Sequence, residues 1–135
     1  MTDVKVTKVE NKENLVLSDA SGKKMTIFSV GMEKALYINE VLEGKKKPGD
    51  DIYSLINSEL RRDLKKRIKA GQKPVNATII YHVLSDGYTG DVCFKVDGST
   101  EMLGEYSASD VILFALRYKI PIRVSESIIK LELLH

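Results

Sequence analysis

The chain contains little of several residue types on which disulfide-stabilised domains and common active sites depend. Its 135 residues include one cysteine, two histidines and no tryptophan. A single cysteine excludes an internal disulfide, and Cys93, in the strand-like run V-C-F, is interpreted as a small buried hydrophobic residue. Zinc sites draw on several cysteines and histidines, so no zinc site is expected. The scarcity of histidine also disfavours a Ser–His–Asp device, and His82 is interpreted as a satisfied or half-exposed strand residue.

Long apolar runs and glycine-rich cofactor motifs are also missing. No apolar run approaches the ~20 residues that a bilayer-spanning helix needs, and the N-terminal M-T-D-V-K-V-T does not resemble a signal peptide. The sequence has no phosphate loop, no G-x-G-x-x-G and no G-x-S-x-G. We therefore expect a cytoplasmic protein that has no membrane contact and no organic cofactor.

The apolar residues that are present suffice for one ordinary domain. Hydrophobic residues make up 43% of the chain, and a chain of this length buries roughly two-thirds of its unfolded surface. We treat residues 1–135 as a single domain. The order of apolar patterns predicts an α+β fold, in which an antiparallel or mixed β-sheet is packed with about three main helices.

The predicted elements are short strands interrupted by helices. Helices are expected from Gly31 to about Glu43 and from about Asp51 to Ala70, the second capped by Asp50 or Asp51. The C-terminal run from Ser125 to His135 fits either a helix or a strand. Strands are expected at Val4–Val6, Leu15–Leu17, Met25–Phe28, Val75–Leu84, Thr89–Val96, Thr100–Tyr106 and Ile122–Val124.

The run S-A-S-D-V-I-L-F-A-L-R-Y-K-I-P-I, which begins at Ser107, carries the clearest local signal. Ser107 and Ser109 are suitable N-caps, and Asp110 places a negative charge at the positive end of the helix dipole. The six residues that follow are apolar and leave no polar face, so this helix is predicted to be buried against a sheet. Pro121 prevents the helix from continuing. The residues predicted to be buried include Leu113, Phe114 and Leu116.

This run resembles the R-P-S-D-A-I-A-L-A-L-R-x-x-x-P-I signature of the bifunctional nuclease domain family. Upstream, I-I-Y-H-V-L-S-D-G-Y-T-G is similar to the family's V-I-x-x-L-x-D-G-T-F-Y-A hairpin, and I-F-S-V-G-M-E-K-A is similar to I-W-I-G-x-x-E-A. The resemblance is strongest over residues 24–125. It implies a nuclease, a phosphodiester hydrolase that binds DNA or RNA. The gap-free matches in the first signature are Ser109, Asp110, Ile112, Ala115, Leu116, Arg117, Pro121 and Ile122.

Several polar residues of the family's motifs are replaced in this chain. The motif R-P-L-T-H-D-L is K-P-G-D-D-I at residues 47–52, which lacks both the histidine and the arginine. The arginine and proline that open R-P-S-D are Ser107 and Ala108. Because the apolar skeleton persists without these side chains, the alternative function is a non-catalytic nucleic-acid-binding or interaction module.

Carboxylates are the remaining resource for catalysis. Phosphodiester hydrolysis commonly uses acidic residues to hold Mg²⁺ or Mn²⁺, which activates water and offsets the phosphate charge. Glu33 and Asp110 lie in the first turns of two predicted helices, and they are the predicted metal ligands and catalytic residues. Helix capping and the helix dipole offer a purely structural alternative for both. Further candidates are Asp86, Asp91 and Glu105.

Basic residues gather in one part of the chain. Residues 45–73 hold ten basic and four acidic residues, although the net charge of the chain is only +2. A cationic helix face can contact nucleic-acid phosphates without reading sequence, and a solvated lysine-rich face is the alternative. A third hypothesis is a structural homo-oligomer joined through sheet edges or the C-terminal segment. The predicted nucleic-acid contacts are Lys45, Lys46, Lys47, Arg61, Arg62, Lys65, Lys66 and Lys69.

Overall fold

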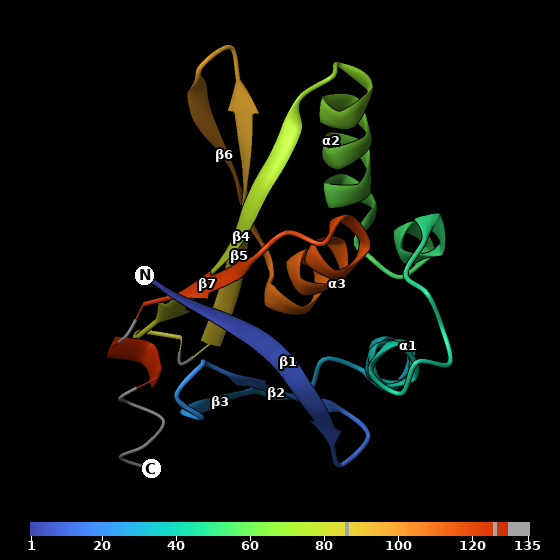
Figure 1. Cartoon of the computed structure of the whole chain (residues 1–135), viewed down its shortest axis with the longest axis vertical. Coiled ribbons are helices and arrows are strands. Elements are labelled where there is room, and N and C mark those ends of the chain that lie inside the picture. The colour runs from blue at the N-terminus through green and yellow to red at the C-terminus, as the bar shows by residue number, and fades with distance from the viewer. Residues whose placement is uncertain (86, 126, 130–135) are drawn as a thin grey trace.

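A computed structural model describes residues 1–85, 87–125 and 127–129. These residues form an α+β fold, in which a seven-stranded mixed sheet has the strand order β3-β2-β1-β7-β4-β5-β6 (Figure 1). The pair β4 and β7 is parallel, and the other neighbouring strands are antiparallel. The elements are β1 (Thr2–Glu10), β2 (Asn14–Ser18), β3 (Lys24–Ile27), α1 (Met32–Leu42), the 3-10 helix η1 (Asp50–Ser54), α2 (Ser58–Lys69), β4 (Lys73–His82), β5 (Gly87–Val96), β6 (Ser99–Ser107), α3 (Ala108–Tyr118) and β7 (Ile122–Val124).

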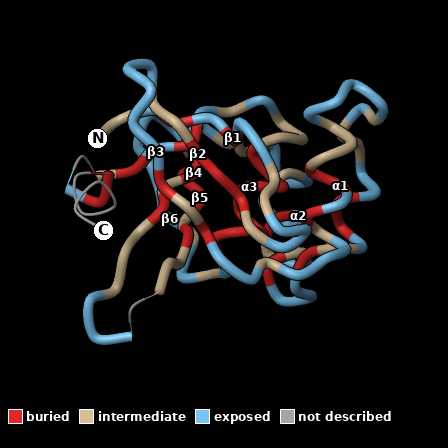
Figure 2. The backbone as a smooth tube through the Cα atoms, turned by 90° about the horizontal axis from the view of Figure 1, so that it is seen from below, coloured by how far each residue is buried: buried red, intermediate tan, exposed pale blue. Residues whose placement is uncertain are grey.

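Helix α3 forms the centre of the hydrophobic core, as its apolar circumference predicts. Its residues from Ala108 to Ala115 are all buried, and Figure 2 shows the helix running through the buried middle of the molecule. The ring of Phe114 lies 6.3 Å from that of Phe94 on β5 and 4.6 Å from that of Tyr118. Aromatic rings at these separations pack favourably in addition to the area that they bury. In the described part of the chain, no helix is long and apolar enough to cross a membrane.

Two predictions are wrong at the edges of the core. Leu116 is only partly buried, because it lines a surface cleft between α3 and β1. Strand β4 ends at His82 rather than at Leu84, so Val83 and Leu84 lie exposed in the turn that follows. The apolar alternation continues past the last strand hydrogen bonds, and it therefore places the boundary too late. Asp86, in the same turn, lies outside the described residues.

The predicted helix over residues 51–70 is split in two. Its first part is η1, and α2 begins only after a break in the helix. Asp51 does not cap α2, because it lies inside η1, where its Oδ1 accepts a 2.7 Å hydrogen bond from the hydroxyl of Tyr37 on α1. The cap is Asn57, whose Oδ1 accepts a 2.8 Å hydrogen bond from the backbone N–H of Glu59. The start of α2 thus coincides with the local cap Asn57 and not with Asp51.

The structure also bears on the predictions for Cys93 and for the C-terminal run. Cys93 is buried on β5, as expected of a small hydrophobic residue. In the C-terminal run, Ile128 and Ile129 are buried and residues 127–129 are helical. Residues 126 and 130–135, which include His135, lie outside the described part of the chain. The other predicted strands and helices are present, and several strands are longer than expected.

Gly90 on β5 lets the start of α3 lie close to the sheet. It is buried, and a Cβ added to it would lie 2.2 Å from Cγ2 of Val111. Valine is branched at Cβ and restricted at χ1, so its side chain cannot rotate freely away from a new methyl group. The position of the first turn of α3 therefore depends on glycine at this point.

Gly90→Ala is expected to reduce the free energy of unfolding by about 1–3 kcal/mol, because the added methyl overpacks the contact between β5 and α3. Urea denaturation measures the change. Gly87→Ala is the matched control in the same strand, since its added Cβ would approach no atom more closely than 3.8 Å. Equal effects of the two substitutions would contradict the close approach of α3 to β5.

Candidate functional site

The starts of three helices meet at one buried carboxylate. The side chain of Asp110 on α3 is 2% exposed. Its Oδ1 lies 2.6 Å from Nζ of Lys34 on α1, and its Oδ2 accepts a 3.1 Å hydrogen bond from the backbone N–H of Asn57, the cap of α2. A charged group this deeply buried needs such partners to offset its desolvation. Asp110 therefore fixes α1, α2 and α3 relative to one another.

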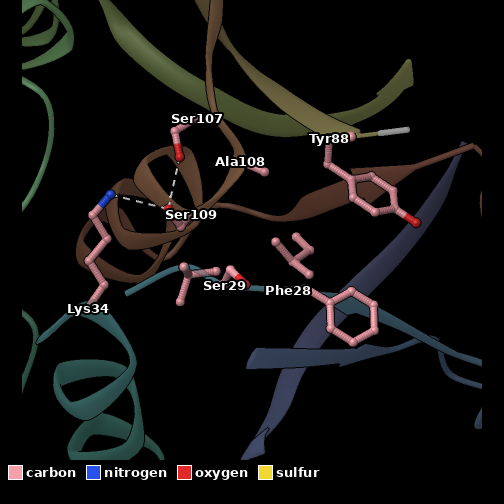
Figure 3. Close-up of a pocket in the computed structure, with 10 residues that line it drawn as sticks. Phe28, Ser29, Lys34, Tyr88, Ser107, Ala108 and Ser109 are labelled. Carbon is pink, nitrogen blue, oxygen red and sulfur yellow. Dashed lines mark hydrogen bonds between the residues drawn. The ribbon is translucent and has the colours of Figure 1, made fainter. Parts of the chain in front are cut away.

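Serine hydroxyls continue this polar cluster toward the surface. Nζ of Lys34 donates a 3.3 Å hydrogen bond to Oγ of Ser109, which lies 2.9 Å from Oγ of Ser107 (Figure 3). Ser107 occupies the predicted N-cap position of α3, but its side chain makes no capping hydrogen bond. Its hydroxyl interacts with Ser109 instead. The two serines thus belong to the lysine cluster rather than to a conventional cap.

Two adjoining clefts open beside this cluster, and Lys34 and Ser107 line both. The larger cleft, of about 640 Å³, lies between α2, α3 and β6 and includes Glu59 and Glu105. The smaller cleft, of about 300 Å³, lies between the segment after β3 and the start of α3. Concave surfaces with a few convergent polar groups are the usual setting of binding sites. We take the two clefts as the candidate functional site.

Thr89 and Glu105 line the larger cleft, and polar side chains of neighbouring strands interact with them. Nε2 of His82 on β4 lies 3.4 Å from Oε1 of Glu105 on β6 and 2.7 Å from Oγ1 of Thr89 on β5. Asp91 on β5 has a buried Oδ1 for which the described residues provide no hydrogen bond. Burial, reinforced by the charge of Glu105, raises the pKa of Asp91, and His82 opposes this shift. Carboxylates with raised pKa values are candidates for function, and Asp91 interacts electrostatically with Glu105, which lines the cleft.

The two predicted metal ligands do not line the same cleft. Glu33 is exposed on α1 and lines a separate, largely apolar cleft with Met32 and Leu36. The starts of α1 and α3 do converge, but Lys34 makes the contact with Asp110. Within residues 1–85, 87–125 and 127–129, no group of three His, Cys, Asp or Glu side chains is placed to hold a metal ion.

Two of the three lysines that are predicted to contact nucleic acid from the loop after α1 have acidic partners within the chain. Nζ of Lys45 lies 2.7 Å from a carboxylate oxygen of Glu43, and Nζ of Lys46 lies 3.6 Å from one of Glu40. Lys47 is exposed beside them. Because these acids already offset part of the positive charge, the loop is a weaker anion-binding surface than its sequence suggests.

Helix α2 is fixed to the sheet by the side opposite its exposed cations. Asp63 accepts a hydrogen bond from the hydroxyl of Tyr106 on β6, and Nη1 of Arg67 lies 2.6 Å from Oε2 of Glu101 on the same strand. Burial and then the bond to Asp63 raise the pKa of Tyr106 to about 12, so the hydroxyl keeps its proton at neutral pH. Arg61 is partly buried. The exposed basic residues of the helix form what we call the outer face of α2, namely Arg62, Lys65, Lys66 and Lys69.

Sequence reasoning did not identify Lys34 or Tyr106 as residues of the site. Their roles depend on partners far away in the sequence, and no local motif distinguishes them from other lysines and tyrosines. No family model matches the chain, and no curated protein matches it. The function of the site therefore has to be argued from its own geometry.

Lys34→Met is expected to destabilise the fold by about 3–5 kcal/mol, because it leaves Asp110 buried without its counter-charge. The double variant Lys34→Met with Asp110→Asn should lose less than the sum of the two single variants. Urea denaturation of all four proteins measures this coupling. Glu33→Gln, at the exposed neighbouring position, should change stability by less than about 0.5 kcal/mol. Strictly additive losses would contradict a direct ion pair.

Asp91→Asn is expected to increase stability at pH 7. The folded state raises the pKa of Asp91 above the value in the unfolded chain, so ionisation of this group destabilises the fold as pH rises through the interval between the two values. The gain should therefore be present at neutral pH and disappear when pH falls below the unfolded pKa. Denaturation between about pH 3 and 7 measures it, with Asp97→Asn in the exposed β5–β6 turn as control. A pH-independent difference would contradict the assignment.

Proposed function

We propose that this chain is a bifunctional nuclease-like protein that binds nucleic acid through the outer face of α2. One observation carries the proposal: four exposed cations share one face of a helix whose other side is fixed to the sheet. Lysine and arginine contact phosphates irrespective of base sequence, and the release of counterions supplies the affinity. Such a surface suits DNA and RNA backbones alike.

The dimensions and local contacts of this face support phosphate binding. From Arg62 to Lys69 the helix rises about 10 Å, a length that spans about four phosphates of one duplex strand at ~3.4 Å of helix axis each. The contact between Nε of Arg62 and Asp63 is long, at 3.7 Å, and competes weakly with an external anion. Nζ of Lys65 lies 5.0 Å from the centre of the Tyr53 ring, which orients the ammonium without neutralising it.

Cleavage of the bound strand is a second candidate function, favoured by the composition of the larger cleft. The first turn of α2 lines this cleft, so a strand on the outer face of α2 would run close to Glu59 and Glu105. These carboxylates would repel phosphate unless a divalent cation offset their charge. Magnesium or manganese needs only one or two protein carboxylates, with water filling the other positions.

The predicted ligands Glu33 and Asp110 suit this chemistry less well than Glu105. Oδ1 of Asp110 lies 2.6 Å from the Lys34 ammonium, which would repel a divalent cation approaching the same oxygen. Glu33 lines a different cleft. Glu105 is exposed at the larger cleft beside His82, which could move a proton. We therefore place the hydrolytic step at Glu105 and assign Asp110 a positioning role.

Replacing all four residues of the outer face of α2 with glutamine should weaken binding to oligonucleotides and flatten its salt dependence. Each lost phosphate contact reduces the slope of log K against log salt by roughly 0.7–0.9, so four contacts reduce it by about 3. Fluorescence anisotropy at several salt concentrations measures both quantities. The matched control removes the same charge from the region of β1–β3, by changing Lys5, Lys8, Lys23 and Lys24 to glutamine.

The control separates local contact from net charge. If both quadruple variants lose affinity equally, only the overall charge matters and the outer face of α2 is not the binding surface. Unchanged affinity and slope in a folded outer-face variant would assign this face to solvent.

Glu105→Gln should abolish metal-dependent cleavage of DNA or RNA and leave most of the binding affinity. The amide keeps the shape of the side chain but removes the charge that a hard cation requires. Turnover is assayed with Mg²⁺, with Mn²⁺ and with a chelator. Glu33→Gln is the matched control and should retain turnover, because Glu33 lies outside the larger cleft.

The wild-type protein decides between the two candidate functions. If it binds oligonucleotides but cleaves none with either metal, the protein is the non-catalytic binding module. If it cleaves and Glu105→Gln cleaves equally, the hydrolytic step does not depend on Glu105, and Asp91 becomes the next residue to test.

A further inference from the structure

The smaller cleft combines an aromatic end with a polar, cationic end. Figure 3 shows the rings of Phe28 and Tyr88 on one side of the cleft, and Lys34, Ser107 and Ser109 on the other. Its volume of about 300 Å³ lies at the lower limit for small-molecule sites, which span roughly 300–1,000 Å³. The cleft therefore suits a small ligand that is flat at one end and anionic at the other.

Phe28 is held at the surface rather than packed into the core. Its side chain is 66% exposed, although it directly follows the last residue of β3. The backbone N–H of Ser29 donates a 3.0 Å hydrogen bond to Oδ1 of Asn14, and that of Val30 donates a 2.9 Å bond to the carbonyl of Glu13. Ser29 has a φ of 56°, a left-handed conformation that side chains other than glycine seldom adopt. The segment is thus anchored in a form that presents the ring to solvent.

Tyr88 faces the same cleft from β5. Its ring lies 5.3 Å from that of Tyr81, its cross-strand partner on β4, so it is supported from the side by another aromatic side chain. A supported ring loses little conformational freedom when a ligand stacks on it. Phe28 and Tyr88 therefore provide an aromatic surface of the kind on which bases stack.

The polar end can accept a phosphate without breaking the ion pair. Lysine has three N–H donors, and Lys34 directs two of them at Asp110 and Ser109. Ser107 is exposed and lines both clefts. A phosphate oxygen could thus accept hydrogen bonds from the remaining ammonium proton and from a serine hydroxyl. Asp110 offsets part of the lysine charge, so stacking at the aromatic end of the cleft must supply much of the affinity.

We infer that the smaller cleft binds one nucleotide unit, with its base against Phe28 and Tyr88 and its phosphate at Lys34 and Ser107. The same chemistry is offered by a free nucleoside monophosphate and by one unstacked nucleotide of a single strand. The strand-bound form rests on the proposed function, since the larger cleft connects the smaller one to α2 through Lys34 and Ser107. A base in a duplex cannot enter, so the site selects single-stranded nucleic acid.

The test compares Phe28→Ala with Leu36→Ala, because both residues have similar exposure, 66% and 60%, and Leu36 lies outside the cleft. The probes are a single-stranded decamer, the same decamer with abasic sites, a duplex decamer and adenosine monophosphate. Phe28→Ala should weaken binding of the intact single strand by between about five- and a hundredfold. It should leave binding of the abasic strand and the duplex unchanged. Phe28→Trp should restore binding, and Leu36→Ala should have no effect.

The outcomes separate this inference from the proposed function. If the outer-face variant of α2 loses affinity and Phe28→Ala does not, the nucleotide site is wrong and the proposed function stands. If wild-type protein binds adenosine monophosphate in a Phe28-dependent way but no oligonucleotide, the site stands for free nucleotides and the proposed function is wrong. If it binds none of the probes, both are wrong. If Phe28→Ala instead dissociates a wild-type dimer in sedimentation, the ring belongs to a subunit contact and the inference is overturned.

Discussion

The ion pair between Lys34 and Asp110 is the contact on which the arrangement of the helices and both clefts depends. Asp110 is buried, and a buried carboxylate is tolerated only when charge and hydrogen bonds offset its desolvation. Its partners come from α1 and from the cap of α2, so this requirement draws the starts of three helices together. The two clefts open where these helix starts meet the sheet, and Lys34 lines both.

Positive and negative side chains lie on different parts of this surface. On α2, Asp63 bonds to Tyr106 of the sheet, and the cations of the outer face and Glu59 are exposed to solvent. Glu59 and Glu105 line the larger cleft instead, and Glu105 interacts with His82 on β4 and with Asp91 on β5. The cationic outer face of α2 thus borders a cleft that is lined by two carboxylates.

Much of the fold could be predicted from the sequence, because α3 and most strands have strong local signals. The apolar circumference of α3, and Pro121 shortly after its last residue, predict a buried helix without reference to the rest of the chain. The start of α2 is predicted too early, because Asp51 and Asn57 are equally good capping residues and the local sequence does not decide between them. The sequence points to Asp110 as a residue of the candidate site. It does not show that Asp110 pairs with Lys34 rather than lying near Glu33, because that contact joins residues far apart in the chain.

The central claim is that the outer face of α2 and the adjoining clefts form one nucleic-acid-binding surface. The most direct test is to titrate isotope-labelled wild-type protein with a single-stranded decamer and to follow the backbone amide signals by NMR. The account predicts that the largest shifts map to residues 58–69 of α2 and to the cleft residues around Phe28, Lys34 and Ser107. Shifts confined to other surfaces, or no shifts at millimolar decamer, would contradict it.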